Sequence, residues 1–256
     1  MDTFTVTTQK GGSCKTTTTV NLAAAAGEAG RRTLVLDLDP QASASKWLGV
    51  APERGLFTVF TEGAPLAPLV RPTQTPGVDV IPASPWLVGI DKALAGEVGT
   101  ETLLRPALAA LPRRWDLALV DCPPSTGLLS VAALVACDGV LVPVEASSMG
   151  LDGLASLIGT VERVRDRLNP GLHLAALLVC RVTRTNLARD VVMSLRARFG
   201  DLVLSTVIRE SVRLQEAPNF AQPITTDEPE GRGAEDYRSA AGELLARLAQ
   251  PVGAHA

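Results

Sequence analysis

One stretch near the N-terminus, residues 4–21 with the sequence FTVTTQKGGSCKTTTTVN, constrains the fold more than any other part of the chain. A β-branched run over residues 4–8 predicts a strand, and a loop with Gly11 and Gly12 follows it. We expect a helix to begin at Lys15 and to continue through the alanines to about residue 29. This order of strand, glycine loop, Lys-Thr and helix is typical of a loop that binds phosphate through backbone amides, a lysine and a helix N-terminus.

The loop departs from the general phosphate-loop pattern G-x-x-x-x-G-K-[ST] at both glycines. Gln9 occupies the first glycine position and Cys14 the second. A side chain before the lysine costs on the order of 1–3 kcal/mol if the backbone has a positive φ there. That cost corresponds to roughly tenfold to a hundredfold in nucleotide affinity. We therefore expect Cys14 to weaken nucleotide binding; a redox role, through a thiol at a helix N-terminus beside Lys15, is the less favoured alternative.

The rest of the chain alternates apolar runs with helical patterns, which is typical of βαβ units on a parallel sheet. Further strands are expected over residues 33–37, 78–82, 115–121, 138–144, 173–180 and 202–208. Further helices are expected within residues 88–111, with a break near Gly99, and over residues 127–136, 150–168, 187–199, 211–218 and 234–250. The pattern predicts an α/β fold in which residues 1–256 form a single doubly wound domain, a mostly parallel central sheet flanked by helices, with residues 251–256 as a frayed tail.

Composition limits the function classes. The 256 residues carry a net charge of −3, so the molecule as a whole does not attract nucleic acid, although a local basic patch remains possible. No N-terminal targeting segment and no apolar stretch long enough to span a bilayer is present, which predicts a cytoplasmic protein. The four cysteines have no paired spacing, which indicates free thiols in a reducing compartment.

Three acids stand at or just after predicted strand ends, namely Asp37, Asp39 and Asp121. In an open α/β sheet the carboxyl ends of the strands meet at one edge, where ligands bind. Each acid alone could simply cap a loop. Together with Lys15 and Thr16, however, they supply what a triphosphate with Mg²⁺ requires, which is a lysine for phosphate, a hydroxyl and a carboxylate near the metal, and a carboxylate that orients water.

The sequence KGGSCKTT resembles the deviant Walker A motif, KGG-x-GKT[ST], of the ParA/MinD class of P-loop ATPases. The resemblance extends over nearly the whole chain through VNLAAAAGEAG, LVLDLDPQ, DLALVDCPPS, LVPVEA, RTNL, VRLQEAPNF and GRGAEDY. DLDPQ and VRLQEAP favour the ParA/Soj partition proteins over MinD, as does the lack of a basic amphipathic membrane-targeting helix in the tail. The resemblance implies a P-loop fold, ATP or ADP as ligand, and a weak Mg²⁺-dependent ATPase.

The resemblance also implies roles for matching residues. Lys15 is expected to bind the β- and γ-phosphates and to be catalytic, and Thr16 to bind Mg²⁺. Asp39 is expected to position the attacking water near the metal, while Asp37 and Asp121 match acids near Mg²⁺, with Asp121 as the Walker B residue. The nucleotide loop is completed by Gly11, Gly12, Ser13, Cys14 and Thr17.

Two further expectations concern partners. The family's extra lysine is Lys10, which is expected to reach the partner's phosphates in an ATP-sandwiched homodimer. That dimer binds DNA without sequence preference through arginines that contact phosphates, so the affinity is salt-sensitive. Arg184 in RTN and Arg213 in VRLQEAP match the family positions best, and the patch extends to Arg181, Arg189, Arg196, Arg198 and Arg209.

One departure affects the DNA surface and the nucleotide base. Many relatives read PRNVRL where this chain has Arg209-Glu210-Ser211-Val212-Arg213-Leu214. A glutamate thus replaces an arginine, and Arg209 replaces a proline near the base, so base contacts and DNA affinity are expected to differ from those of the relatives.

Three functions follow as hypotheses. The first is a nucleoid-associated partition ATPase that segregates chromosome or plasmid DNA with a ParB-like partner. The second is a non-enzymatic DNA-binding or scaffold protein whose nucleotide binding is impaired by Cys14. The third is a MinD-like positioning ATPase, which the missing membrane helix disfavours.

Overall fold

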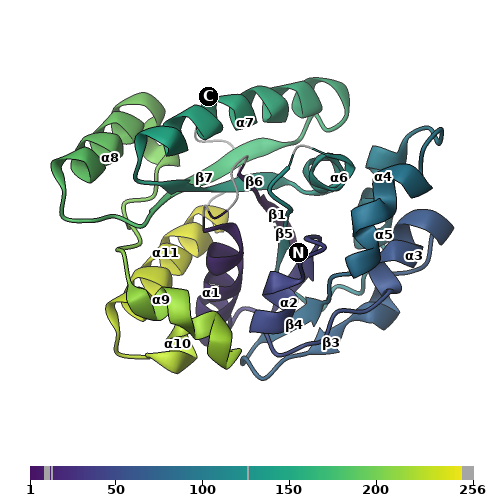
Figure 1. Ribbon diagram of the computed structural model, residues 1–256, viewed down its shortest axis with the longest axis horizontal. Coiled ribbons are helices and arrows are strands. Elements are labelled where there is room, and N and C mark those ends of the chain that lie inside the picture. Colours follow the sequence, from purple (N-terminus) through teal and green to yellow (C-terminus); the bar gives the residue numbers. More distant parts are fainter. Residues whose placement is uncertain (9–11, 13, 126, 250–256) are drawn as a thin grey trace.

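The apolar runs form a seven-stranded sheet at the centre of the computed structural model, which describes residues 1–8, 12, 14–125 and 127–249 (Figure 1). The strand order is β3-β4-β2-β5-β1-β6-β7, and all neighbours are parallel except β3 and β4. The predicted doubly wound, mostly parallel sheet is therefore confirmed. The strands are β1 (Asp2–Val6), β2 (Thr33–Asp37), β3 (Arg71–Pro72), β4 (Val78–Ile81), β5 (Leu117–Asp121), β6 (Gly139–Glu145) and β7 (His173–Cys180).

Helices cover both faces of this sheet, as strands that are apolar at every position require. One face packs against α1 (Lys15–Glu28), α2 (Ser43–Trp47), α9 (Val212–Glu216), α10 (Ile224–Asp227) and α11 (Arg232–Leu248). The other packs against α3 (Gly55–Glu62), α4 (Ile90–Ala93), α5 (Leu104–Ala109), α6 (Leu128–Ala136), α7 (Ser148–Arg167) and α8 (Asn186–Phe199). Short 3₁₀ helices span Ala67–Leu69, Pro85–Gly89, Thr100–Thr102, Gly200–Leu202 and Ala217–Phe220.

Successive side chains of each strand point to opposite faces of the sheet, so the hydrophobic core is divided between the two faces. In β2, Val35 joins the cluster that contains α1 and α11, whereas Leu34 and Leu36 join the cluster under α3, α5 and α6. Helix α1 is buried along most of its length because it lies between the sheet and α11. Its small alanines permit this close packing. At Gly27 an added Cβ would lie 2.2 Å from the carbonyl oxygen of Pro76, so only glycine lets α1 approach the segment before β4.

The prediction of a last strand over residues 202–208 is wrong. This segment lies beside β7 but forms only isolated bridges, Leu177 with Val203 and Val182 with Arg209. Between them the backbone amides of residues 205 and 206 donate to the carboxylate of Glu243 on α11, both at 2.7 Å. A side chain thus takes the hydrogen bonds that a continuous ladder would need, an arrangement that no local pattern of apolar residues reveals.

Smaller differences concern element bounds. The first strand lies two residues earlier than predicted, over Asp2–Val6, and the helical pattern of residues 88–111 divides into several short helices. Within the part of the chain that the structure describes, no helix is long and apolar enough to cross a bilayer.

Candidate nucleotide and DNA sites

Three central strands bring the candidate site together at the carboxyl edge of the sheet. Asp121, the last residue of β5, is in register with Val6 of β1 on one side and Asp37 of β2 on the other. Because β1 leads at this same edge into the loop before α1, the loop and the two carboxylates converge. The convergence predicted from the sequence is therefore present in the fold.

The loop itself is described in part. Gln9, Lys10, Gly11 and Ser13 lie outside the described residues, so the predicted roles of Lys10, Gly11 and Ser13 stay predictions. Gly12 has φ +74° and Cys14 has φ +63°. Cys14 thus takes the left-handed conformation that was expected of a glycine, at a cost of about 1–2 kcal/mol. The backbone at Cys14 therefore follows the path of a glycine.

The N-terminus of α1 is suited to an anion. Cys14 is the N-cap residue and makes no side-chain capping hydrogen bond, and the described first turn contains no acidic residue. The amides of this turn and the positive end of the helix dipole therefore favour a phosphate group. Lys15, the first helical residue, is buried and adds a positive charge at this place.

Two threonines of α1 hold the carboxylate of Asp121. Thr16 Oγ1 donates to Asp121 Oδ2 at 2.7 Å, and Thr19 Oγ1 donates to Asp121 Oδ1 at 3.1 Å. Thr16 is a site residue predicted from the sequence, whereas Thr19 is not. The spacing of three residues, which places both on one face of the helix, is the signal that could have identified Thr19.

Electrostatics at these residues favour a bound cation. Burial, and after it the neighbouring Asp37 carboxylate, raise the pKa of Asp121 to about 8. Burial lowers the pKa of Lys15, while the charges of Asp121 and Asp39 oppose that change. Adjacent buried carboxylates at two strand ends need a proton or a cation close by. A hydroxyl beside a carboxylate fits Mg²⁺, which takes only one or two protein carboxylates and completes its shell with phosphate oxygens and water.

The described residues contain no group of three or more His, Cys, Asp or Glu side chains that could hold a metal ion by itself. The hydrogen-bonded pair of Thr16 and Asp121 is the part of the described site that fits Mg²⁺.

The Asp37 carboxylate has hydrogen-bond partners within the fold. It is fully buried, and its Oδ2 accepts hydrogen bonds from the backbone N–H and the hydroxyl of Ser45, at 2.8 and 2.7 Å. Its Oδ1 accepts from the N–H of Asp39 at 3.1 Å, and burial raises the pKa of Asp37 to about 6. Because Ser45 Oγ also accepts from the N–H of Ala83 at 2.9 Å, Asp37 fixes the segment that carries Asp39.

Asp39 follows the end of β2 at the same edge of the sheet. Its side chain is nearly buried, its Oδ1 accepts from the N–H of Gln41 at 2.9 Å, and its charge acts on Lys15. Thr17, the last predicted residue of the loop, is partly exposed on the first turn of α1.

A cysteine that the sequence analysis did not select also belongs to this region. The Cys180 thiol is the largest cause that lowers the pKa of the Cys14 thiol, and burial opposes it. Cys180 ends β7 and is buried. The two cysteines are far apart in the sequence, so their spacing gives no signal.

The arginines that match DNA-binding positions lie along one part of the surface. Val182 N–H donates to the carbonyl of Ile208 at 3.0 Å, and Glu210 N–H donates to the carbonyl of Val182 at 3.1 Å. These bonds bring the segments just before Arg184 and Arg213 side by side. Both arginines are exposed, and so is Arg189 on α8.

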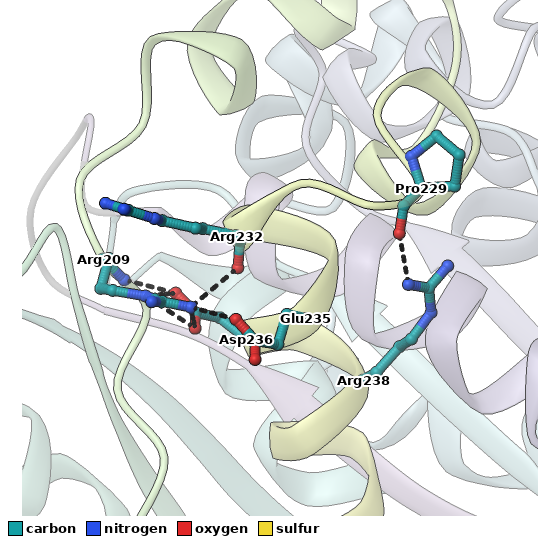
Figure 2. Close-up of polar contacts among 6 residues, drawn as sticks. All are labelled: Arg209, Pro229, Arg232, Glu235, Asp236 and Arg238. Atoms are coloured by element: carbon teal, nitrogen blue, oxygen red, sulfur yellow. Dashed lines mark hydrogen bonds and ion pairs between the residues drawn. The ribbon is translucent and has the colours of Figure 1, made fainter.

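Other predicted DNA contacts are engaged within the protein. Arg181 pairs with Glu145 at 3.4 Å and with Glu210 at 3.7 Å. Figure 2 shows Arg209 directed at the start of α11, where its Nη2 lies 2.5 Å from Asp236 Oδ1 and 2.7 Å from Glu235 Oε2. The Asp236 side chain is only 8% exposed, so Arg209 neutralises a buried charge.

The Arg209→Ala substitution is expected to lower the free energy of unfolding by about 2 kcal/mol, because it leaves Asp236 without its cation. The matched control is Arg232→Ala, since Arg232 contributes only its backbone carbonyl to this network and its removal should change stability by less than about 0.5 kcal/mol (Figure 2). Urea denaturation of both variants measures the effect. Equal stabilities would show that the ion pairs of Arg209 contribute nothing to the fold.

Comparison with known proteins identifies the family. Residues 1–174 match the AAA_31 family, described as an AAA domain. The chain is 46% identical over 241 residues to the chromosome-partitioning ATPase Soj of Thermus thermophilus, and the match covers 94% of each chain. The chain belongs to the ParA/Soj family. A second relative, the sporulation initiation inhibitor protein Soj of Bacillus subtilis, is 38% identical over 245 residues, which cover 94% of this chain and 97% of that one.

Solved structures share the fold of this chain. Cobyrinic acid a,c-diamide synthase from Mycobacterium smegmatis, crystallised with an ATP analogue and magnesium, superposes with a TM-score of 0.83 at 30% identity, covering 97% of this chain and 96% of that chain. The family and the P-loop ATPase fold that the motifs predicted are thus confirmed, and the partition ATPases among the relatives support a ParA-like function.

Proposed function

We propose that this protein is a ParA-type partition ATPase. It binds Mg²⁺ and ATP at the N-terminus of α1, forms an ATP-sandwiched homodimer, and in that state binds DNA without sequence preference on the nucleoid. A ParB-like partner stimulates its weak hydrolysis and releases it from DNA, so that chromosome or plasmid DNA is segregated. The observation that carries this proposal is the hydrogen bond from Thr16 to Asp121 beside the buried Lys15, in a chain 46% identical to Soj.

Within this proposal we assign a role to each site residue. Lys15 and the first-turn amides of α1 bind the β- and γ-phosphates, and Thr16 with Asp121 and Asp39 holds Mg²⁺. When bound, Mg²⁺ neutralises phosphate charge and orients the triphosphate for in-line attack. Asp39 holds the attacking water, and the bonds of Asp37 to Ser45 keep the Asp39 segment in place. In the dimer, Lys10 contacts the phosphates bound by the other protomer.

The proposed DNA surface consists of Arg184, Arg189 and Arg213. All three are exposed, and the only ion pair of Arg213 among the described residues is a 3.7 Å contact with Glu216, an exposed pair of little energetic weight. These guanidinium groups can therefore turn to DNA phosphates at small cost. Arg181 and Arg209 would first have to leave their acidic partners, so they contribute less.

The second candidate is a DNA-binding scaffold without nucleotide turnover, and the positive φ of Cys14 is the observation that favours it. Binding of a fluorescent ATP analogue and phosphate release, measured for the wild type beside Cys14→Gly, distinguish the two. We expect the wild type to bind Mg·ATP and to hydrolyse it slowly, and the glycine variant to be more stable by about 1 kcal/mol. A wild type that binds DNA but no ATP would overturn the ATPase proposal.

A further inference from the structure

The carboxylate of Asp121 has a threonine hydroxyl at each of its two oxygens. Thr16 Oγ1 lies 2.7 Å from Oδ2, and Thr19 Oγ1 lies 3.1 Å from Oδ1. Asp121 is 0% exposed, so bulk water does not compete for either oxygen. Two hydroxyls on one helix therefore fix both the position and the rotation of this carboxylate.

The two threonines differ in their place on α1. Thr16 is the second residue of the helix and is partly exposed at the end where the candidate phosphate site lies. Thr19, three residues further into the helix, is fully buried. Because both lie on one face of α1, Thr19 reaches Asp121 from deeper in the fold. Oδ2 is thus the oxygen at the ligand side of the carboxylate, and Oδ1 is the oxygen held within the protein.

The Thr19 hydroxyl has a second acceptor within reach. It lies 3.0 Å from the carbonyl oxygen of Lys15, four residues earlier in the helix, and threonines within helices commonly make this bond. A hydroxyl has one proton, so it donates to only one of the two acceptors at a time. Hydrogen bonds to an ionised carboxylate are about twice as strong as neutral ones. Thr19 therefore donates to Asp121 when the carboxylate is ionised, which is the form that binds a cation.

We propose that Thr19 is a positioning residue for Mg²⁺. Its bond to Oδ1 holds the Asp121 carboxylate so that Oδ2, together with the Thr16 hydroxyl, is presented to the metal. This inference rests on the proposed function, because it requires Mg²⁺ to bind here with ATP. Residues that orient a metal-binding carboxylate from behind typically contribute about 10- to 100-fold in metal affinity. Thr19 thus acts on the metal through Asp121 and does not touch it.

The neighbouring threonine of α1 provides a matched control. Thr18 is also fully buried, but its hydroxyl lies 3.4 Å from the Tyr237 hydroxyl and 3.8 Å from Cys180 Sγ. Thr19→Val and Thr18→Val each remove one buried hydroxyl from the same helix and keep the β-branched shape of the side chain. Only the first change removes a bond to Asp121. Comparing the two variants therefore separates the orientation of the carboxylate from the general loss of a buried hydroxyl.

The experiment measures the affinity of the full-length protein for a fluorescent, slowly hydrolysed ATP analogue, once with saturating Mg²⁺ and once with EDTA. The ratio of the two affinities is the factor by which the protein strengthens Mg²⁺ binding to the nucleotide. We expect Thr19→Val to lower this ratio at least about tenfold, with the affinity in EDTA unchanged. Thr18→Val should keep the wild-type ratio, and Thr19→Ser, which retains a hydroxyl, should restore most of it. Thermal unfolding verifies that each variant is folded, and Thr19→Ala serves as a second variant without the hydroxyl.

Three results would overturn the role of Thr19 and leave the proposed function intact. They are a wild-type ratio in Thr19→Val, an equal fall of the ratio in Thr18→Val, and a loss of affinity in Thr19→Val that is the same with Mg²⁺ and with EDTA. The last would show that Thr19 only supports the helix. A wild type that binds no ATP, or that binds it equally with Mg²⁺ and with EDTA, would overturn the proposed function and the role of Thr19 with it.

Discussion

Replacing Lys15 with alanine is expected to weaken Mg·ATP binding by at least about 100-fold. Hydrogen bonds to charged groups contribute about 1.5–3 kcal/mol each, and a P-loop lysine makes more than one of them to phosphate oxygens. In this protein the effect should be large because Lys15 is buried, so that water screens its charge poorly. Isothermal titration with ATP and Mg²⁺ measures the loss.

The matched control for this prediction is Lys92→Ala, which removes the same charge from an exposed position on α4. It should bind ATP as the wild type does. Thermal unfolding must show that the Lys15→Ala protein is folded, since Lys15 lies close to the charges of Asp39 and Asp121. A folded Lys15→Ala variant with wild-type affinity would place the nucleotide elsewhere.

Replacing Arg184 and Arg213 together with alanine is expected to lower DNA affinity at least tenfold at physiological salt. Each phosphate contact that is lost also reduces the slope of log K against log salt by about 1. Because neither side chain has a strong partner within the described protein, their loss should leave stability within about 0.5 kcal/mol of the wild type. Fluorescence anisotropy with a labelled duplex at several salt concentrations, in the presence of an ATP analogue, measures both quantities.

Arg165→Ala provides the control for charge alone. Arg165 lies in the last turn of α7, which begins at the carboxyl edge after β6 and ends at the opposite edge of the sheet (Figure 1). Its removal should leave the salt slope unchanged. If the double variant keeps the full slope, or if Arg165→Ala loses as much affinity, DNA binds to a different surface.

The sequence predicted the parts of the fold that local pattern determines. The bounds of β2 and β7 agree with the apolar runs because strands buried on both faces are apolar at nearly every position. The convergence of Thr16 with Asp121 was also predictable, since parallel topology places the ends of β1 and β5 at one edge. What failed was the segment of residues 202–208, where the carboxylate of Glu243 replaces the ladder.

The features that the sequence did not predict depend on contacts between distant segments of the chain. Nothing near Asp37 indicates that Ser45 would occupy one of its oxygens, and nothing near Arg209 indicates that Asp236 would hold it. Sequence motifs assigned roles to these residues as family positions, whereas the side chains around them decide whether they face a ligand or the protein.

The most direct test of the central claim is the nucleotide dependence of DNA binding by the wild-type protein. Anisotropy of a labelled duplex of arbitrary sequence is measured at one salt concentration with Mg²⁺ and a slowly hydrolysed ATP analogue, with ADP, and without nucleotide. Binding at least tenfold tighter with the ATP analogue than with ADP, and loss of that difference in Lys15→Ala, is the predicted result. Equal binding in all three conditions would contradict an ATP-switched partition function.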